Sequence, residues 1–363
     1  MTSIPILSFN SSQSPESKQQ FLSDLRHALI NTGFLYLRDT PVNPSPLLPY
    51  IPKLFALPQD EKDRISMRNS PHFLGYTRLG GERTKGKVDW REQIDLATPH
   101  VCRWKNKEES PDYHRVWGPS QYPSEEALPG FKEAIDNYQA QLTTLGNTLV
   151  TLIAEALGLG SDGLAKFYAG PEKMQHRGKI VCYPVNEDDE GQGVGPHYDA
   201  GFLTILLQAS DHPGLQVQAL TGEWLDAPPI PGTFVINFGR ALEFATKGVV
   251  RATSHRVLSP SKEWAEKGPR YSVPLFHNID MEKKWLMSCL QVPQEILDLR
   301  DKRGKLPDTD SVNYSEFLSE PSGRVQLYGR VKSHPDVGER WYPEIFGRFF
   351  PQGLPQDGRG NAY

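Results

Sequence analysis

Cysteine is scarce in this sequence: only Cys102, Cys182 and Cys289 occur among 363 residues. They are odd in number, far apart and never in a CxxC spacing. This excludes a disulfide framework and gives no cysteine-based zinc motif. We interpret them as three unrelated, reduced thiols that behave as small hydrophobic side chains. Such cysteine usage is typical of an intracellular protein.

Long apolar runs and an excess of positive charge are also lacking. No run approaches the ~18 apolar residues that a membrane span needs. Neither the start (Met1–Asn10) nor the end (Gly360–Tyr363) carries a recognisable secretion, lipidation or peroxisomal signal. The formal net charge is −4, which argues against a broad basic surface for nucleic acid or an anionic membrane. We therefore expect a cytoplasmic protein with no nucleic-acid partner, no membrane partner and no obligate protein partner.

The sequence pattern of residues 1–120 predicts a helix-rich N-terminal region. Ser14 and Pro15 are typical of a helix start, apolar residues then recur at helical spacing up to Leu29, and Gly33 is a stop signal. Further predictions are a strand at Phe34–Leu37, a helix within Ile51–Leu57 and irregular loops from Pro71 to Pro123.

The sequence pattern of residues 121–363 predicts a long helix followed by a β-rich core. An apolar stripe indicates a helix from Ser124 to Gly158 that backs the core. From about 178 to 280, short β-rich runs alternate with turn residues, which favours a sandwich or barrel. The predicted strands are Lys179–Tyr183, Leu203–Gln208, Leu215–Gln218, Gly232–Phe238, Ser254–Leu258 and Arg270–Phe276, and the predicted C-terminal helices are Gln294–Asp301 and Tyr314–Leu318. The predicted fold is a mostly β core with flanking helices, a double-stranded β-helix (jelly roll), in one compact structural unit.

Two histidines and an aspartate form the main candidate site. His197 and Asp199 are two residues apart, so on a strand their side chains would point the same way. His255, on a later predicted strand, is the natural third ligand. Two imidazoles and one carboxylate on one face of a metal are the facial triad of non-haem Fe(II) oxygenases. We predict that these three residues are both the metal ligands and the catalytic centre.

Arg270 and Ser272 form a second candidate site, on the strand that follows His255. Their spacing directs both side chains to the same face. A guanidinium and a hydroxyl placed in this way can bind a carboxylate. A dicarboxylic cosubstrate needs such a group for its distal end.

The order of the motifs resembles the isopenicillin N synthase-like family of Fe(II)/2-oxoglutarate-dependent dioxygenases. The likeness covers Ile4–Leu37 and most of the stretch from Gly193 to Pro274. It implies iron ligation by His197, Asp199 and His255, and binding of the 2-oxoglutarate C5 carboxylate by Arg270 and Ser272. Tyr183, in Cys182–Pro184, matches a tyrosine that supports this cosubstrate.

The resemblance also implies a reaction. Fe(II), 2-oxoglutarate and O₂, with ascorbate as a possible support, would hydroxylate, desaturate or cyclise a small-molecule substrate and release succinate and CO₂. Three alternatives stay open. One is an oxidase like isopenicillin N synthase, which does not use 2-oxoglutarate. The second is ethylene formation, because Gly80–Glu92 resembles a segment of ethylene-forming enzymes. The third is a degenerate binding or sensor protein.

Two positions depart from the family pattern. Arg240 stands where an aspartate is common after Asn237-Phe238-Gly239, so a local polar contact must differ. Val181 stands where an asparagine is common, which removes one polar group near the cosubstrate or the substrate.

Overall fold

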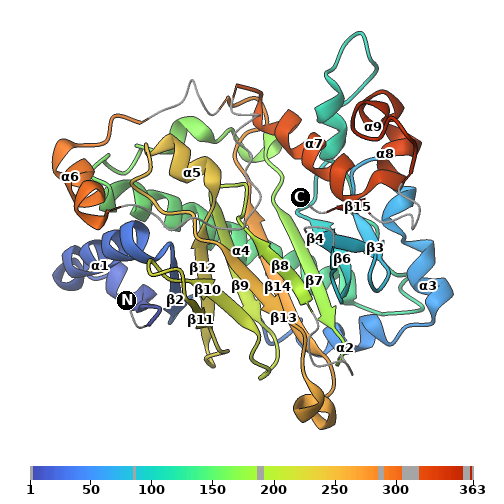
Figure 1. Cartoon of the computed structure of the whole chain (residues 1–363), viewed down its shortest axis with the longest axis horizontal. Coiled ribbons are helices and arrows are strands. Elements are labelled where there is room, and N and C mark those ends of the chain that lie inside the picture. The colour runs from blue at the N-terminus through green and yellow to red at the C-terminus, as the bar shows by residue number, and fades with distance from the viewer. Residues whose placement is uncertain are drawn as a thin grey trace.

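The computed structural model describes residues 3–84, 87–185, 192–284, 290–304, 319–354 and 360–361. Its larger sheet has eight strands in the order β1-β2-β12-β9-β14-β7-β6-β3 (Figure 1). All neighbouring pairs are antiparallel except β1 and β2. The strands are β1 (Ile6–Ser8), β2 (Phe34–Arg38), β3 (Gly75–Thr77), β6 (Glu92–Ala97), β7 (Arg177–Tyr183), β9 (Leu203–Gln208), β12 (Thr233–Phe238) and β14 (Arg270–His277).

A second, four-stranded sheet has the order β11-β10-β13-β8. Its strands are β8 (Gln192–His197), β10 (Leu215–Gln218), β11 (Trp224–Asp226) and β13 (His255–Leu258). Along β12, Phe234 and Ile236 pack into the core on the helical side, whereas Val235 packs into a core shared with β8, β10 and β13. This alternation is the two-residue period of a strand buried on both faces. The two sheets form the predicted jelly roll.

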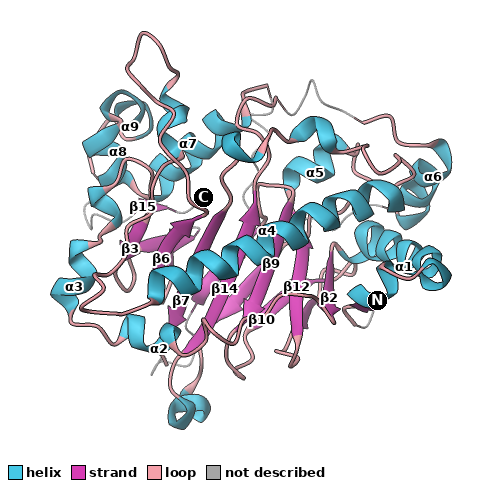
Figure 2. Cartoon of the chain, turned by 180° about the vertical axis from the view of Figure 1, so that it is seen from behind, coloured by secondary structure: helices cyan, strands magenta, loops and turns pink. Residues whose placement is uncertain are grey.

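Helices cover the outer face of the larger sheet. Figure 2 shows α4 (Phe131–Ala156) crossing the sheet, with α1 (Pro15–His27) beside the N-terminal strands. The apolar stripe of α4, including Leu142, Leu145 and Leu149, is almost completely buried. Each such side chain contributes roughly 1.5–3 kcal/mol of burial free energy. The helix is therefore a rigid support for the strands that carry the site.

Two predicted helix starts differ from the structure. The long helix begins at Phe131 rather than Ser124, because Pro129 lacks an amide donor and Gly130 adopts a left-handed φ of 75°. Ser14 occupies the N-cap position of α1 as predicted, but its hydroxyl bonds the Glu16 carboxylate rather than a backbone amide.

The prediction of irregular loops from Pro71 to Pro123 was wrong in part, because β3 and β6 extend the larger sheet there. Gln93 and Asp95 of β6 are buried, although their alternation with apolar residues is typical of a solvent-facing strand. They meet polar partners inside the protein instead of water. A small sheet lies next to them, formed by β4 (Glu82–Thr84), β5 (Lys87–Val88) and β15 (Gly360–Asn361).

The C-terminal segment is helical, as predicted. The predicted helix at Gln294–Asp301 is confirmed as α6 (Gln294–Arg303), whereas Tyr314–Leu318 and Cys289 lie outside the described residues. The two described cysteines are free thiols. The other described α-helices are α2 (Tyr50–Phe55), α3 (Gln59–Arg64), α5 (Arg240–Ala245), α7 (Ser322–Ser333), α8 (Pro335–Trp341) and α9 (Pro343–Phe349). Short 3-10 or π turns lie at Phe9–Ser12, Ala28–Thr32, Met67–Asn69, Asp112–Val116, Ala165–Phe167, Pro171–Lys173 and Lys262–Lys267. None of the described helices is long and apolar enough to cross a membrane.

The N-terminal and C-terminal regions share one sheet and adjoining cores. Strands β1, β2, β3 and β6 come from residues 1–120 and pair within the same sheet as β7, β9, β12 and β14. Helices α7 to α9 pack against the turn at Asp112–Val116 and against Phe73. We therefore propose that residues 1–120 and 121–363 fold as one unit.

Candidate metal centre

His197 and His255 lie directly opposite each other on the antiparallel strands β8 and β13. Their ring centroids are 4.2 Å apart. The Nδ1 of His197 donates to the Gly195 carbonyl (2.8 Å), and the Nδ1 of His255 donates to the Thr253 carbonyl (3.1 Å). Because Nδ1 is committed to a carbonyl in both rings, each Nε2 becomes the ligand atom.

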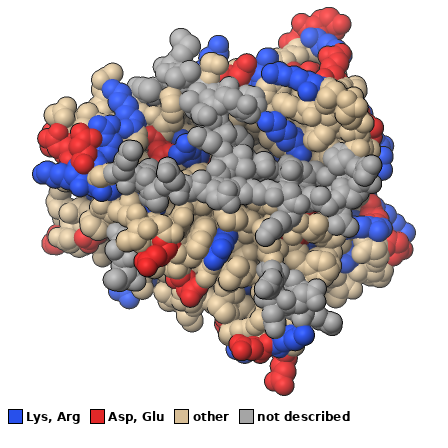
Figure 3. All heavy atoms as spheres, in the orientation of Figure 1, with Lys and Arg blue, Asp and Glu red and all other residues tan. Residues whose placement is uncertain are grey.

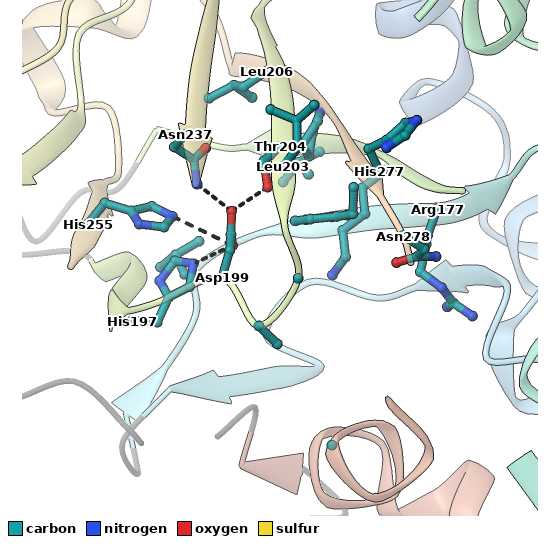
Figure 4. A pocket seen from close by; sticks show the side chains of 18 of the residues that line it. Arg177, His197, Asp199, Leu203, Thr204, Leu206, Asn237, His255, His277 and Asn278 are labelled. Carbon is teal, nitrogen blue, oxygen red and sulfur yellow. Dashed lines mark hydrogen bonds and ion pairs between the residues drawn. The ribbon is translucent and has the colours of Figure 1, made fainter. Parts of the chain in front are cut away.

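Asp199 completes this arrangement. Its Oδ1 lies 4.0 Å from Nε2 of His197 and 3.9 Å from Nε2 of His255. Its Oδ2 accepts hydrogen bonds from Thr204 Oγ1 (2.5 Å) and Asn237 Nδ2 (2.6 Å), as the dashed lines in Figure 4 show. The three potential ligand atoms all lie within 4.8 Å of one another. The predicted residues therefore meet at one point.

The reason for this convergence differs in part from the prediction. Strand β8 ends at His197, so the two-residue period of a strand does not extend to Asp199. The hydrogen bonds from Thr204 on β9 and Asn237 on β12 orient the carboxylate instead.

The surroundings favour the protonation states that a metal requires. Burial and the neighbouring His255 lower the pKa of His197 to about 3, so its imidazole is neutral. Burial alone would raise the pKa of Asp199, but the two imidazoles and the hydrogen bonds from Thr204 and Asn237 lower it overall. Neutral imidazoles and an ionised carboxylate are the ligand forms that bind a divalent cation. The donor set on one face fits Fe(II).

Arg270 lies in the same cavity and is almost completely buried, at 1% exposure. Its Nη2 donates to Gln208 (3.1 Å), and its guanidinium lies 5.0 Å from the centre of the Tyr183 ring. Among the described residues, its Nε and Nη1 have no hydrogen-bond partner. A buried charge with unused donors is costly unless an anion binds it. Burial also lowers the pKa of this guanidinium.

Ser272 and Tyr183 stand beside Arg270. Arg270 pairs with Tyr183 across β14 and β7, and Ser272 follows two residues later on the inward face of β14. All three line a cavity of about 200 Å³ that also contains the His197, Asp199 and His255 side chains. One cavity thus joins the predicted cosubstrate residues to the predicted metal ligands.

The two departures from the family pattern have different consequences. Val181 is buried and lines the cavity, facing Ser272 on the neighbouring strand, so the lost polar group belongs to this wall. Arg240 forms an ion pair with Glu243, and its guanidinium lies 5.0 Å from the Tyr198 ring centre. Both of these contacts are with neighbouring protein side chains.

The sequence reasoning missed several polar residues of this site. Thr204 and Asn237 were not assigned a role, although both are polar residues inside largely apolar strands. The same signal marks Lys179 on β7. Arg330 on α7 also lines the cavity, but its sequence context has no comparable signal.

The comparisons with known proteins agree with this geometry. Residues 4–125 match the family model described as the non-haem dioxygenase in morphine synthesis N-terminal region, and residues 172–279 match that of the 2OG-Fe(II) oxygenase superfamily. The chain belongs to the 2OG-Fe(II) oxygenase superfamily. It is therefore an enzyme, a dioxygenase that uses Fe(II) and 2-oxoglutarate.

Curated relatives match along most of their length. The 2-oxoglutarate-dependent dioxygenase frbJ of a Dothideomycetidae species is 42% identical, over 94% of this chain and 93% of the relative. A 2-oxoglutarate-dependent dioxygenase of Gibberella zeae is 35% identical, over 95% and 92%. The homoarginine-6-hydroxylase 2-ODD-233 of Oryza sativa is 31% identical, over 84% and 88%.

A solved structure shares the fold. It is a full-length Neurospora crassa protein in complex with alpha-KG and thymine, and it superposes with a TM-score of 0.66 at 22% identity. The likeness covers 90% of this chain and 97% of the Neurospora crassa chain. The jelly roll and its flanking helices are therefore common to both proteins.

Proposed function

We propose that His197, Asp199 and His255 hold the Fe(II) and that Arg270, Ser272 and Tyr183 hold the distal carboxylate of 2-oxoglutarate. The enzyme then hydroxylates a small, polar organic molecule and releases succinate and CO₂. One observation supports this most strongly: the Nε2 and Oδ1 ligand atoms and the unpartnered nitrogens of Arg270 face the same cavity.

The protein groups have separate tasks in this reaction. Bound iron supplies the activation of O₂ for oxidative decarboxylation of the cosubstrate and oxidation of the substrate. Thr204 and Asn237 hold the Asp199 carboxylate in one orientation, so that Oδ1 stays directed at the metal position. Arg270 anchors the far end of the cosubstrate, which fixes its position relative to the metal. Apolar side chains of the cavity wall, such as Val194 and Val257, exclude water from the part of the cavity that holds the cosubstrate.

Three features support a small polar substrate. The cavity, of about 200 Å³, is of the size that small molecules occupy. Among the similar proteins, four relatives are named for homoarginine hydroxylation, and the Neurospora crassa protein was solved in complex with thymine. On the face shown in Figure 3, the coloured Lys and Arg side chains are interspersed with Asp and Glu and form no broad basic patch of the kind that nucleic acid needs.

The test is a turnover assay with Fe(II), 2-oxoglutarate, ascorbate and O₂, with and without a panel that includes arginine, homoarginine and pyrimidine bases. Succinate, oxygenated products and headspace ethylene are measured together. We expect one succinate for each hydroxylated product. Substantial ethylene would support the fragmentation alternative. Product formation without 2-oxoglutarate would support the oxidase alternative.

A further inference from the structure

A buried cluster of charged residues extends along the cavity, from beside Tyr183 to the opposite end. Its three carboxylates are almost inaccessible to solvent, with exposures of 0% to 4%. Four cationic side chains line the cavity itself. The carboxylates are Glu82, Asp89 and Asp95, and the cations are Arg91, Arg177, Lys179 and Arg330. Four cations thus face three carboxylates, which leaves one positive charge in excess.

Two of the four cations are held by the protein. Arg91 forms an ion pair with Glu82 and lies 3.4 Å from Asp89. Arg177 donates to the backbone carbonyls of Phe73 (2.6 Å) and His72 (2.7 Å). Neither arginine can turn toward a ligand without losing these bonds.

Lys179 and Arg330 are held less completely. The Lys179 ammonium lies 3.8 Å from the Glu82 carboxylate and 3.7 Å from the Asp95 carboxylate, beyond direct hydrogen-bonding distance. Arg330 uses Nη1 to bond Asp95 at 3.1 Å. Burial lowers the pKa of Lys179, while Asp95 and Glu82 oppose the effect. An anion that entered here would satisfy the ammonium hydrogens and favour its charged form.

The carboxylates are poor receptors for a cationic group. Glu82 is already contacted by Arg91 and by His334, whose Nε2 lies 2.7 Å away. Asp95 accepts hydrogen bonds from Arg330 and from Gln93. A second cation would have to displace these partners, whereas an anion finds donors in place.

The strand geometry separates Lys179 from the cosubstrate residues. Lys179, Val181 and Tyr183 alternate along the same inward face of β7. Lys179 and Tyr183 are four residues apart, which is ~13 Å along a strand. At the Tyr183 end, a ferrous ion, Asp199, dianionic 2-oxoglutarate and Arg270 balance in charge. Arg91 and Asp89, 3.4 Å apart and nearer to Tyr183, offset each other. The remaining three cations and two carboxylates leave the excess positive charge at the Lys179 end.

We infer that the substrate carries a carboxylate and that Lys179 and Arg330 bind it, at the end of the cavity opposite Arg270. This inference rests on the proposed function, because it takes the metal and cosubstrate positions from it. It names the substrate class that the site selects: small organic acids rather than their neutral or cationic analogues.

The test uses pairs of small acids and their primary amides, including L-amino acids and aromatic acids. Each compound is titrated into the anaerobic complex of the enzyme with Fe(II) and 2-oxoglutarate, and the change in its visible absorption is recorded. The best acid should bind at least tenfold more tightly than its amide. Lys179→Met and Arg330→Gln should each weaken acid binding roughly ten- to a hundred-fold and reduce the preference over the amide. Lys179→Arg should retain it.

Lys62→Met is the matched control. Lys62 is also a buried lysine, paired with Glu92 at 3.2 Å, but it does not line the cavity. This variant should keep the acid preference of the wild type. Equal binding of acids and amides, no binding of any acid, or an unchanged preference in folded Lys179→Met would overturn the inference. Failure of the proposed function would look different, because wild-type enzyme would then form no absorbing complex with Fe(II) and 2-oxoglutarate at all.

Discussion

Asn237 donates a hydrogen bond of 2.6 Å to Oδ2 of Asp199, the carboxylate oxygen that is not directed at the two imidazoles. Thr204 donates to the same oxygen, so that Oδ2 has two protein partners and Oδ1 remains for the metal. Since Asn237 and Thr204 lie opposite each other on β12 and β9, the larger sheet sets the orientation of a ligand from the loop that follows β8.

The first prediction concerns these two donors. Thr204→Val preserves the shape of the side chain but removes the hydroxyl, and Asn237→Leu removes the amide. Each change should weaken Fe(II) binding by roughly 10–100-fold, because the carboxylate loses a partner that orients it. Thr204→Ser, which keeps the hydroxyl, is the control and should bind close to wild type. Metal titration by calorimetry measures the effect. Wild-type affinity in both Thr204→Val and Asn237→Leu would contradict it.

The second prediction concerns the buried charge of Arg270. Arg270→Met should weaken 2-oxoglutarate binding roughly ten- to a hundred-fold, because a charge-assisted contact is lost. Without 2-oxoglutarate, the variant should be at least as stable as wild type, because the guanidinium has unsatisfied donors among the described residues. Thermal unfolding with and without 2-oxoglutarate separates the two effects. Arg64→Ala, at an exposed position, is the control. An undiminished thermal shift in Arg270→Met would mean that another residue holds the carboxylate.

The third prediction concerns pH. His176 stacks on His277 with ring centroids 4.0 Å apart, and burial lowers the pKa of His176 to about 4. In the unfolded chain this histidine has an ordinary pKa of about 6.5 and binds a proton below that pH. In the folded chain it stays neutral until the pH approaches 4. The stabilising contribution is complete above pH 6.5 and is lost as the pH falls toward 4. When the pH falls from 7.5 to 5, protonation of His176 in the unfolded chain should lower the free energy of unfolding by about 2 kcal/mol.

Urea unfolding of wild type and His176→Gln at pH 7.5 and 5 tests the third prediction. The variant should lose less stability between the two pH values, because it has no imidazole to protonate at this position. Parallel losses in both proteins would show that His176 does not cause the pH dependence.

The central part of the fold could be predicted from the sequence because its signals are local. Strands β9, β10 and β14 have apolar runs bounded by turn residues, and their predicted bounds agree with the structure to within one residue. His197, His255 and Arg270 stand in short motifs on these or adjoining strands, and Asp199 lies in the loop directly after β8. Their meeting in one cavity follows from the jelly roll.

Other parts depend on contacts that no local pattern encodes. Strand β6 alternates polar and apolar residues, but its polar side is buried against charged partners. Arg330 meets Asp95 across 235 residues of sequence, through a helix that packs on the jelly roll only in the folded chain. The end of the cavity that selects the substrate is built largely from such long-range pairs, which is why sequence motifs alone do not indicate its substrate.

The most direct test of the iron site is an anaerobic titration with Fe(II) and 2-oxoglutarate, followed by visible absorption. It compares the wild-type enzyme with Asp199→Ala. Asp226→Ala, which removes an exposed carboxylate from β11, is the matched control. We predict a weak charge-transfer band that saturates at one iron and one 2-oxoglutarate per chain in wild type and Asp226→Ala, and no band in Asp199→Ala, with native circular dichroism in all three. A band of full intensity in Asp199→Ala would contradict the assignment of His197, Asp199 and His255 as the iron site.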